Sequence, residues 1–205
     1  MQGIPKSSVR TKAPEVRRTD IMDSAQNLFI KQGVVTTTVD QITSGANVAK
    51  GTFYLYFASK EELLTALGER FGQELLKVIH AAVIKHPEDD YLRRLAAWMK
   101  ACSIGYLDSV RVHDAIFWDA WPRTRDGLVN NIVIEDLYLM LDEGNKVGVW
   151  SFADTRMTAV FLFNGIHSIV DYFILKQKRV NRVKLVSIVE DLLLRTVGVP
   201  NELYA

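Results

Sequence analysis

Residues 38–60 read TVDQITSGANVAKGTFYLYFASK, and this stretch predicts two short helices that are followed at once by a third. Thr38 and Gln41 have the spacing of a capping box, in which each side chain hydrogen-bonds the other residue's backbone N–H. Ser59 and Glu62 repeat that spacing, so another helix is expected to begin there. The stretch therefore has the pattern of a helix-turn-helix.

The turn and an upstream helix complete a three-helix unit. Gly45-Ala46-Asn47 has the composition of a turn between the two short helices. Residues 18–32 carry an apolar face at helical spacing, formed by Ile21, Ala25, Leu28 and Phe29. Gly33 stands where a left-handed residue commonly ends a helix. Three helices of this size can share a small core and leave one helix exposed.

The second short helix, residues 48–57, is expected to have an apolar side and a polar side. Phe53 and Phe57 are assigned to the core. The opposite side carries ammonium and hydroxyl groups, which can bind phosphates or base edges in a DNA major groove, and a glycine, which lets the backbone approach the duplex. The N-termini of the neighbouring helices favour phosphate oxygens as well. The predicted interface with double-stranded DNA comprises Thr38, Ala49, Lys50, Gly51, Thr52, Tyr54, Tyr56 and Lys60.

The segment VAKGTFYLYFASKEEL, residues 48–63, resembles the recognition helix and the start of the next helix in the TetR family of tetracycline-repressor-like regulators. The resemblance runs from about Arg17 to Leu67, roughly a quarter of the chain. It implies a homodimer that binds a palindromic operator and releases it when a small molecule occupies the C-terminal domain. It also implies DNA contacts at Thr38, Lys50, Gly51, Thr52, Tyr54, Tyr56 and Lys60. Relatives often have Ser at position 49 and His at position 56, so Ala49 and Tyr56 leave the operator sequence open.

Length and charge agree with a DNA-binding protein of one large or two small domains. The chain has 205 residues, of which 48% are hydrophobic, and a net charge of +1. Residues 1–60 contain eight Lys or Arg and four Asp or Glu, so this part carries +4 and the rest −3. A modestly basic N-terminal part is typical of a protein that reads sequence rather than one that coats DNA.

The N-terminal residues and the single cysteine suggest a cytoplasmic protein. Residues 1–16 are polar, contain two prolines and lack the apolar stretch of a secretory signal. They are expected to form a flexible basic arm that could reach DNA. Cys102 alone cannot form an intramolecular disulfide, which favours a reducing compartment. The most apolar stretch, residues 159–174, is interrupted by polar residues and shorter than the about 20 residues of a membrane span, so no membrane is expected.

The remainder of the chain is predicted to be helical, which makes the fold class all-α. The expected domains are the arm (1–16), a helix-turn-helix domain (17–60) and a helical effector-binding and dimerisation domain (61–205). A helix at 60–85, long enough to link the two domains, is expected to end at His86-Pro87. Further helices are expected at 89–108, 111–121, 125–146, 154–176 and 181–197.

The helices at 154–176 and 181–197 are the expected dimer interface. They have more apolar surface than one neighbouring helix can cover, which favours a four-helix bundle across a two-fold axis. The predicted interface residues are Val160, Phe163, Gly165, Val170, Phe173, Val186, Val189 and Leu193. The alternative, in which both helices are simply core, remains open.

A small-molecule pocket is expected among the aromatic residues of the second domain. The predicted lining is Trp98, Cys102, Tyr106, Phe117, Trp118, Trp121, Phe161, Asn164 and His167. Such a pocket suits an apolar or aromatic effector, and aromatic rings beside a carboxylate would also suit a cation. Polar anchors are expected among Asp119, His113, Asn164, His167 and Asp171. For each aromatic residue, core packing is the competing interpretation.

Other functional classes fit the sequence poorly. No nucleophile motif, phosphate-binding glycine loop or metal-binding His pair is present, and the four histidines are scattered, so neither an enzyme nor a cofactor is expected. An effector-independent regulator and a helical protein-interaction module remain as alternatives. The sequence favours a dimeric repressor, because repression needs only a bound protein that obstructs polymerase.

Overall fold

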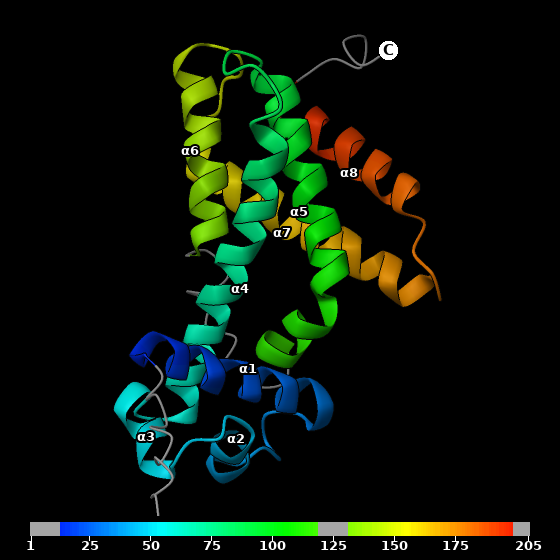
Figure 1. Cartoon of the computed structure of the whole chain (residues 1–205). Helices are drawn as coiled ribbons and strands as arrows, with labels where there is room; N and C mark the ends of the chain where they lie inside the picture. Colours follow the sequence, from blue (N-terminus) through cyan, green and yellow to red (C-terminus); the bar gives the residue numbers. More distant parts are fainter. Residues whose placement is uncertain (1–12, 119–130, 199–205) are drawn as a thin grey trace, which may run out of the picture. The chain divides into compact units, whose positions relative to one another are not determined.

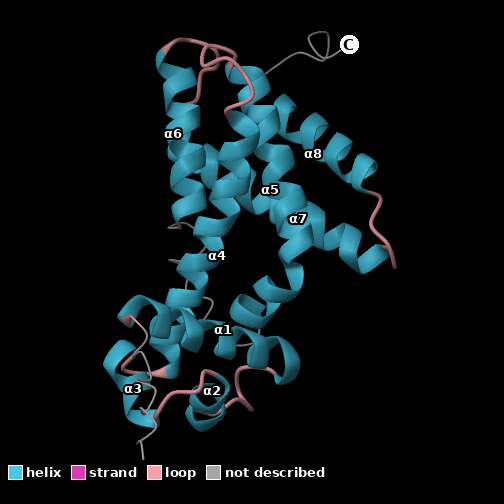
Figure 2. Cartoon of the chain, in the orientation of Figure 1, coloured by secondary structure: helices cyan, strands magenta, loops and turns pink. Residues whose placement is uncertain are grey.

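The computed structural model describes residues 13–118 and 131–198 (Figure 1). These residues form eight α-helices and one π-helical turn, without a β-strand among them (Figure 2). The predicted all-α class is therefore confirmed. Contacts within the chain divide it into two compact units, with the boundary between Leu67 and Gly68.

The first unit contains α1 (Pro14–Gln32), α2 (Val39–Gly45), α3 (Lys50–Tyr56) and the start of α4 (Lys60–Val83). The first helix begins four residues earlier than predicted, because Pro14 at its first position is pre-organised for a helix and needs no N–H partner there. Residues 14–16, predicted to lie in the arm, therefore belong to α1. The rest of the predicted arm lies outside the described residues.

The caps predicted for α2 and α4 are present, the second in altered form. Thr38 Oγ1 accepts from the Gln41 N–H at 3.2 Å, and Gln41 Oε1 accepts from the Thr38 N–H at 2.9 Å. At α4, Ser59 Oγ accepts from the Glu62 N–H at 3.2 Å. The Glu62 carboxylate accepts from the backbone N–H of Ala58, at 2.6 Å, instead of that of Ser59.

In the first unit, Gly45 lets two helices pack closely, and Asn47 turns the chain in a left-handed conformation. A Cβ on Gly45 would lie 2.3 Å from Ser24 Oγ, and that hydroxyl donates to the Ile42 carbonyl at 2.8 Å. Glycine at this position therefore lets α2 approach α1. Asn47 has a φ of 54°, which Asn tolerates better than most residues, and it reverses the chain before α3.

The second unit contains the rest of α4 with α5 (Tyr91–His113), the π-helical turn η1 (Asp114–Trp118), α6 (Ile132–Lys146), α7 (Thr155–Lys176) and α8 (Arg182–Thr196). The break predicted between residues 108 and 111 is wrong, since α5 continues to His113 and passes into η1. The start of α6 is capped by Asn131, whose Oδ1 accepts from two backbone N–H groups.

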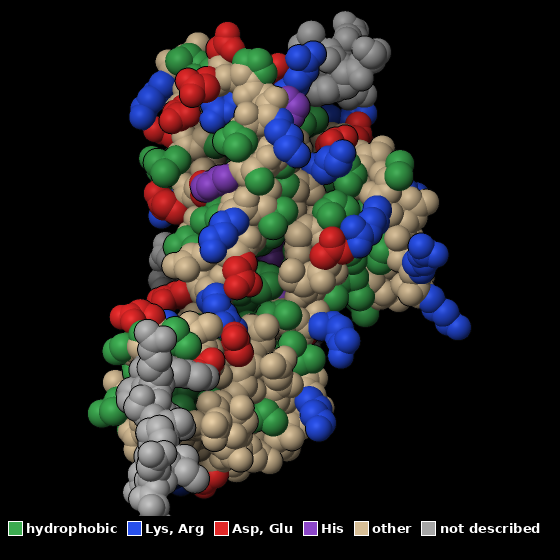
Figure 3. All heavy atoms as spheres, viewed as in Figure 1, with side chains coloured by type: hydrophobic (Ala, Val, Ile, Leu, Met, Phe, Trp, Pro, Cys, Tyr) green, Lys and Arg blue, Asp and Glu red, His purple; other side chains and the backbone are tan. Residues whose placement is uncertain are grey.

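The second unit has its core around α7, which crosses α5 and packs against α5, α6 and α8 (Figure 1). One face of α7 is buried, formed by Ala159, Leu162, Ile166, Val170 and Phe173. On the face drawn in Figure 3, acidic and basic side chains are interspersed over the helices of this unit. That mixture agrees with the nearly balanced charge of residues 61–205.

By length and composition alone, α7 could cross a membrane, and it is the one helix of the described residues that could. The apolar stretch 159–174 noted in the sequence lies within this helix of 22 residues. The apolar residues on its buried face are explained by packing against α5, α6 and α8.

Candidate nucleic-acid interface and ligand site

The third helix, α3, is fixed to the first unit by two phenylalanines. Phe53 and Phe57 are buried, as predicted, and their rings contact each other with centroids 5.8 Å apart. The opposite side of α3 faces solvent: Ala49, Lys50 and Gly51 are exposed and Tyr54 is 53% exposed. The predicted DNA-contacting residues of α3 are thus available at one surface, with Thr52 and Tyr56 half-buried beside them.

Gly51 occupies open space. A Cβ built on it would meet no atom within 4 Å, and its backbone has no positive φ. Nothing within the described fold therefore requires glycine at this position, although glycine in a helix costs about 1 kcal/mol relative to alanine. A partner that approaches the backbone closely would require it.

Lys50 is held toward α2 by an exposed ion pair. Its Nζ lies 3.0 Å from Asp40 Oδ1 and 3.1 Å from Oδ2. The hydrogen bond to Asp40 raises the pKa of Lys50. The pair is solvent-exposed, and such pairs contribute little to stability, so the ammonium can exchange Asp40 for a phosphate at small cost.

Lys60 has an intramolecular contact that the sequence did not predict. Its Nζ donates to the backbone carbonyls of Val34, at 2.8 Å, and Thr37, at 3.1 Å. The ammonium therefore stabilises the loop between α1 and α2, and two of its three protons are already used. A lysine at the start of a helix gives no sequence signal for carbonyls 23 and 26 residues upstream, so this contact could not be predicted.

One residue of the exposed surface was missed by the sequence interpretation. Leu55 is 81% exposed on α3, four residues after Gly51 and therefore on the same face. An apolar side chain in a major groove can contact a thymine methyl group. Its position between two tyrosines predicted to face DNA could have indicated this exposure. An apolar residue in a helix, however, is usually assigned to the core.

In the second unit, the structure brings together three of the predicted pocket residues: Tyr106, Phe117 and His167. The His167 ring lies 4.4 Å from the Tyr106 ring, and the His113 ring lies 4.6 Å from Tyr106 and 4.9 Å from Phe117. We call the whole group, with its polar partner, the histidine–aromatic cluster: Phe71, Tyr106, His113, Phe117, Phe163, His167 and Asp171.

Other predicted pocket residues lie elsewhere. Trp98 and Cys102 are buried in the core, and burial raises the pKa of the Cys102 thiol. Phe161 is exposed and contributes no ring to the histidine–aromatic cluster. Asn164 donates to the Val160 carbonyl at 2.8 Å. Trp121 and Asp119 lie outside the described residues, as does the side chain of Trp118.

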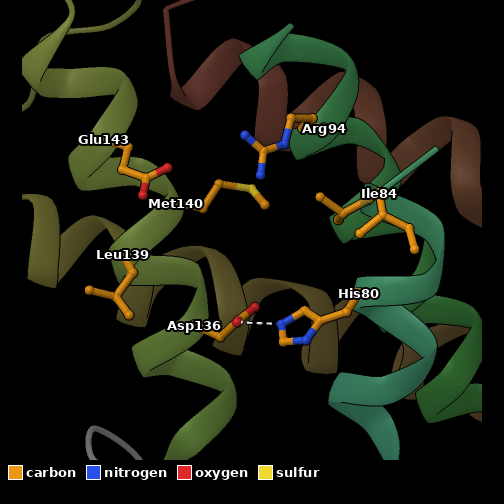
Figure 4. A pocket seen from close by; sticks show the side chains of 8 residues that line it. His80, Ile84, Arg94, Asp136, Leu139, Met140 and Glu143 are labelled. Atoms are coloured by element: carbon orange, nitrogen blue, oxygen red, sulfur yellow. Dashed lines mark hydrogen bonds and ion pairs between the residues drawn. The ribbon is translucent and has the colours of Figure 1, made fainter. Parts of the chain in front are cut away.

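A groove of about 200 Å³ lies among α4, α5 and α6 (Figure 4). Asp136 stands at its floor and accepts from His80, at 2.5 Å, and from the Trp98 indole, at 2.7 Å. Arg94 and Glu143 extend over the same groove from α5 and α6 (Figure 4). None of the residues predicted for a pocket lines this groove. Trp98 is connected to it by the hydrogen bond from its indole to Asp136.

The predicted dimer residues are mostly internal to the protomer. Val170, Phe173, Val189 and Leu193 are buried in its core, so they cannot lose further surface to a partner. Phe163 contacts His167, and Gly165 lies against Leu193 of the same chain. Val160, Phe163, Gly165 and Val186 stay partly exposed. The large exposed apolar residues of α7 and α8 are instead Met157, Phe161, Tyr172, Leu175, Val183 and Leu192.

The first unit is thus an all-helical helix-turn-helix domain with an exposed third helix. Comparison with protein families agrees: residues 21–67 match the family model described as bacterial regulatory proteins, tetR family. The repressor KstR2 of Rhodococcus jostii is 32% identical over 71 residues, which cover 35% of each chain. The chain spans about a quarter to a third of the length of the curated relatives it matches.

Solved structures extend the likeness to the whole fold. A TetR-family structure from Shewanella sp. PV-4 has a TM-score of 0.71 at 21% identity and covers 88% of this chain and 97% of its own. RolR in complex with resorcinol has a TM-score of 0.65 at 23% identity, covering 91% of this chain and 89% of its own. Residues 21–67 thus match the model of the tetR family, and the chain shares the fold of these TetR-family structures.

Proposed function

We propose that the chain is a transcriptional repressor that binds a palindromic DNA operator as a homodimer. The observation that carries this proposal is the surface of α3, where Lys50, Gly51 and Tyr54 face solvent while Phe53 holds the opposite side. A short helix that is buried on one side and presents polar groups on the other is suited to a major groove, which admits an α-helix.

The exposed residues divide into groups that position the protein and groups that read bases. Lys50 contacts phosphate or a guanine edge, and the hydroxyls of Tyr54, Tyr56 and Thr38 bond phosphates. Thr52 and Leu55 are placed to meet bases, where a methyl or isobutyl group can contact thymine. Gly51 leaves room for the sugar–phosphate backbone.

The dimer would form through the exposed apolar residues of α7 and α8. Tyr172 and Leu175 lie three residues apart on α7, and Leu175 is 83% exposed. Val183 and Leu192 add apolar surface on α8. Two-fold pairing of such surfaces would set the two α3 helices for successive major grooves, about 34–36 Å apart.

A small molecule bound in the second unit would release the operator, in the cytoplasm. The histidine–aromatic cluster supplies a site of suitable chemistry, and RolR, of the same fold, binds resorcinol. The relative KstR2 is a repressor. The helix α4 begins in the first unit and carries Phe71 of the cluster in the second. A shift of α4 caused by the ligand would therefore move the first unit as well. An effector-independent regulator is the alternative.

Selection of duplexes from a random library by the full chain tests DNA recognition. We expect a palindromic sequence to be enriched, and Lys50→Ala and Tyr54→Ala to weaken binding to it at least tenfold with an unchanged far-UV spectrum. The control is Lys77→Ala, which removes an exposed lysine of α4. No enriched sequence, or equal binding by all three variants, would exclude α3 as the interface.

A further inference from the structure

The histidine–aromatic cluster contains more polar groups than a packed core needs. Tyr106 OH donates to Asp171 Oδ1 at 2.7 Å, and the rings of His113 and His167 both contact the Tyr106 ring, with their own centroids 5.6 Å apart. The cluster sits where α5 changes into the π-helical turn η1. Single π-helical turns of this kind occur frequently at functional sites.

Hydrogen bonds fix which nitrogen of each imidazole carries the proton. His167 Nδ1 lies 3.2 Å from the Phe163 carbonyl, and a carbonyl only accepts, so Nδ1 is the protonated nitrogen. His113 Nδ1 lies 3.3 Å from the Asp114 carboxylate and is protonated for the same reason. Burial lowers the pKa of both side chains, that of His167 to about 4, so both rings are neutral near pH 7. In each ring Nε2 is therefore an acceptor.

Neither Nε2 atom has a hydrogen-bond partner among the described residues. Yet no fully buried side-chain nitrogen or oxygen of these residues lacks a partner. The two Nε2 atoms are therefore accessible to solvent, and the His113 side chain is 16% exposed. Phe71, Phe117 and Phe163 surround the rings with apolar walls.

We propose that the histidine–aromatic cluster binds an uncharged aromatic compound through a hydroxyl group, which donates to the free Nε2 atom of His113 or His167. This inference rests on the effector role proposed above and adds the chemical class of the effector. The aromatic walls match a planar ring, and two adjacent acceptors match O–H donors.

Charged compounds fit the same site less well. A carboxylate would meet two acceptors and the Asp171 carboxylate, with no Lys or Arg in the cluster to pair with it. An ammonium would have to lose its water against neutral imidazoles, and Asp171 already accepts the Tyr106 hydroxyl. Core packing alone would explain the phenylalanines but not two acceptors without donors.

Four compounds that share one ring separate these possibilities: 4-methylphenol, toluene, 4-methylbenzoate and 4-methylbenzylammonium. Calorimetric titration into the full chain without DNA is expected to show 4-methylphenol binding roughly five- to tenfold more tightly than toluene, the effect of about one net hydrogen bond. The two ions are expected to bind more weakly still. Equal binding of toluene, tighter binding of either ion, or no binding of 4-methylphenol would overturn the proposal.

Two variants locate the binding. His167→Phe and His113→Phe keep an aromatic ring but remove an acceptor, so at least one of them should reduce the preference for 4-methylphenol over toluene, while the control His86→Gln should preserve it. Operator binding in the absence of ligand shows that each variant is folded. A preference that survives both His variants would contradict the assignment. Release of operator is measured separately: if 4-methylphenol binds with the expected preference but leaves the complex intact, the ligand class stands and the proposed inducer mechanism fails.

Discussion

At the scale of single residues, Gly51 separates what folding needs from what DNA binding needs. Its missing side chain would point into open space, so the fold gains nothing from glycine there. Gly45 shows the opposite case, since its Cβ would meet Ser24 Oγ at 2.3 Å. Two glycines six residues apart thus serve different ends, one for the approach of another helix and the other for the approach of a partner.

Replacement of Gly51 by alanine should therefore leave the fold intact and damage DNA binding. We expect the free energy of unfolding to stay the same or rise by up to about 1 kcal/mol, because alanine favours the helix. Operator affinity should fall at least tenfold, because the added methyl group separates α3 from the duplex. Urea unfolding and fluorescence anisotropy measure the two quantities; an unchanged affinity would mean that no partner approaches this backbone.

His167 makes stability depend on pH in a defined direction. Its pKa is about 4 in the folded chain and near 6.5 when exposed, so between these values the unfolded chain binds a proton that the folded chain does not. The free energy of unfolding should therefore fall as pH decreases from 6.5 to 4, by up to about 3 kcal/mol from this group. His113, whose pKa is also lowered, acts in the same direction, while Asp171 and Tyr106 face both rings.

The contribution of His167 is isolated by comparison with His167→Phe. Urea unfolding of both proteins at several pH values should show a smaller loss of stability in the variant between pH 6.5 and 4. If both proteins lose the same free energy of unfolding between pH 6.5 and 4, His167 is solvated in the folded state and its imidazole is not held neutral.

At the scale of elements, two lysines at the ends of neighbouring helices have different tasks. Lys50 on α3 pairs with exposed Asp40 and is free to exchange partners. Lys60 on α4 holds the carbonyls of Val34 and Thr37 and so fixes the loop before α2. Of the two, Lys50 is the one placed to neutralise a DNA phosphate, which releases a counterion from DNA.

The salt dependence of operator binding distinguishes these tasks. Lys50→Ala should leave stability nearly unchanged but reduce the slope of log affinity against log salt by about one. Lys60→Met should keep that slope and lower the free energy of unfolding by about 1–3 kcal/mol, since two carbonyls lose their donor. A reduced slope with unchanged stability in Lys60→Met would restore Lys60 to the predicted DNA contacts.

Sequence patterns predicted the elements of the first unit well because local rules govern them. The capping box at Thr38, the positive φ at Gly33 and the burial of Phe53 and Phe57 each depend on residues a few positions apart. In the second unit, the side of a helix that meets the core depends on which helices surround it. Periodicity showed α7 to be apolar on most sides but could not tell buried Phe173 from exposed Phe161.

At the scale of the whole molecule, the proposed function requires two copies of the chain. Operator binding by a monomer would use one α3 and half of the contacts. The double variant Tyr172→Glu/Leu175→Glu places charges on the exposed apolar side of α7, so we expect it to be monomeric by analytical ultracentrifugation and to bind the operator at least a hundredfold more weakly. Leu139→Glu is the control, because it changes an exposed leucine of α6. A dimeric double variant would move the interface to another surface.

Backbone amide chemical shifts of the full chain, recorded with and without the selected operator, test most directly whether α3 reads DNA. The largest changes should fall on residues 49–56, with smaller changes at the N-terminus of α2. If those residues keep their shifts while others change on binding, DNA is held by a different surface and the role assigned to α3 is wrong.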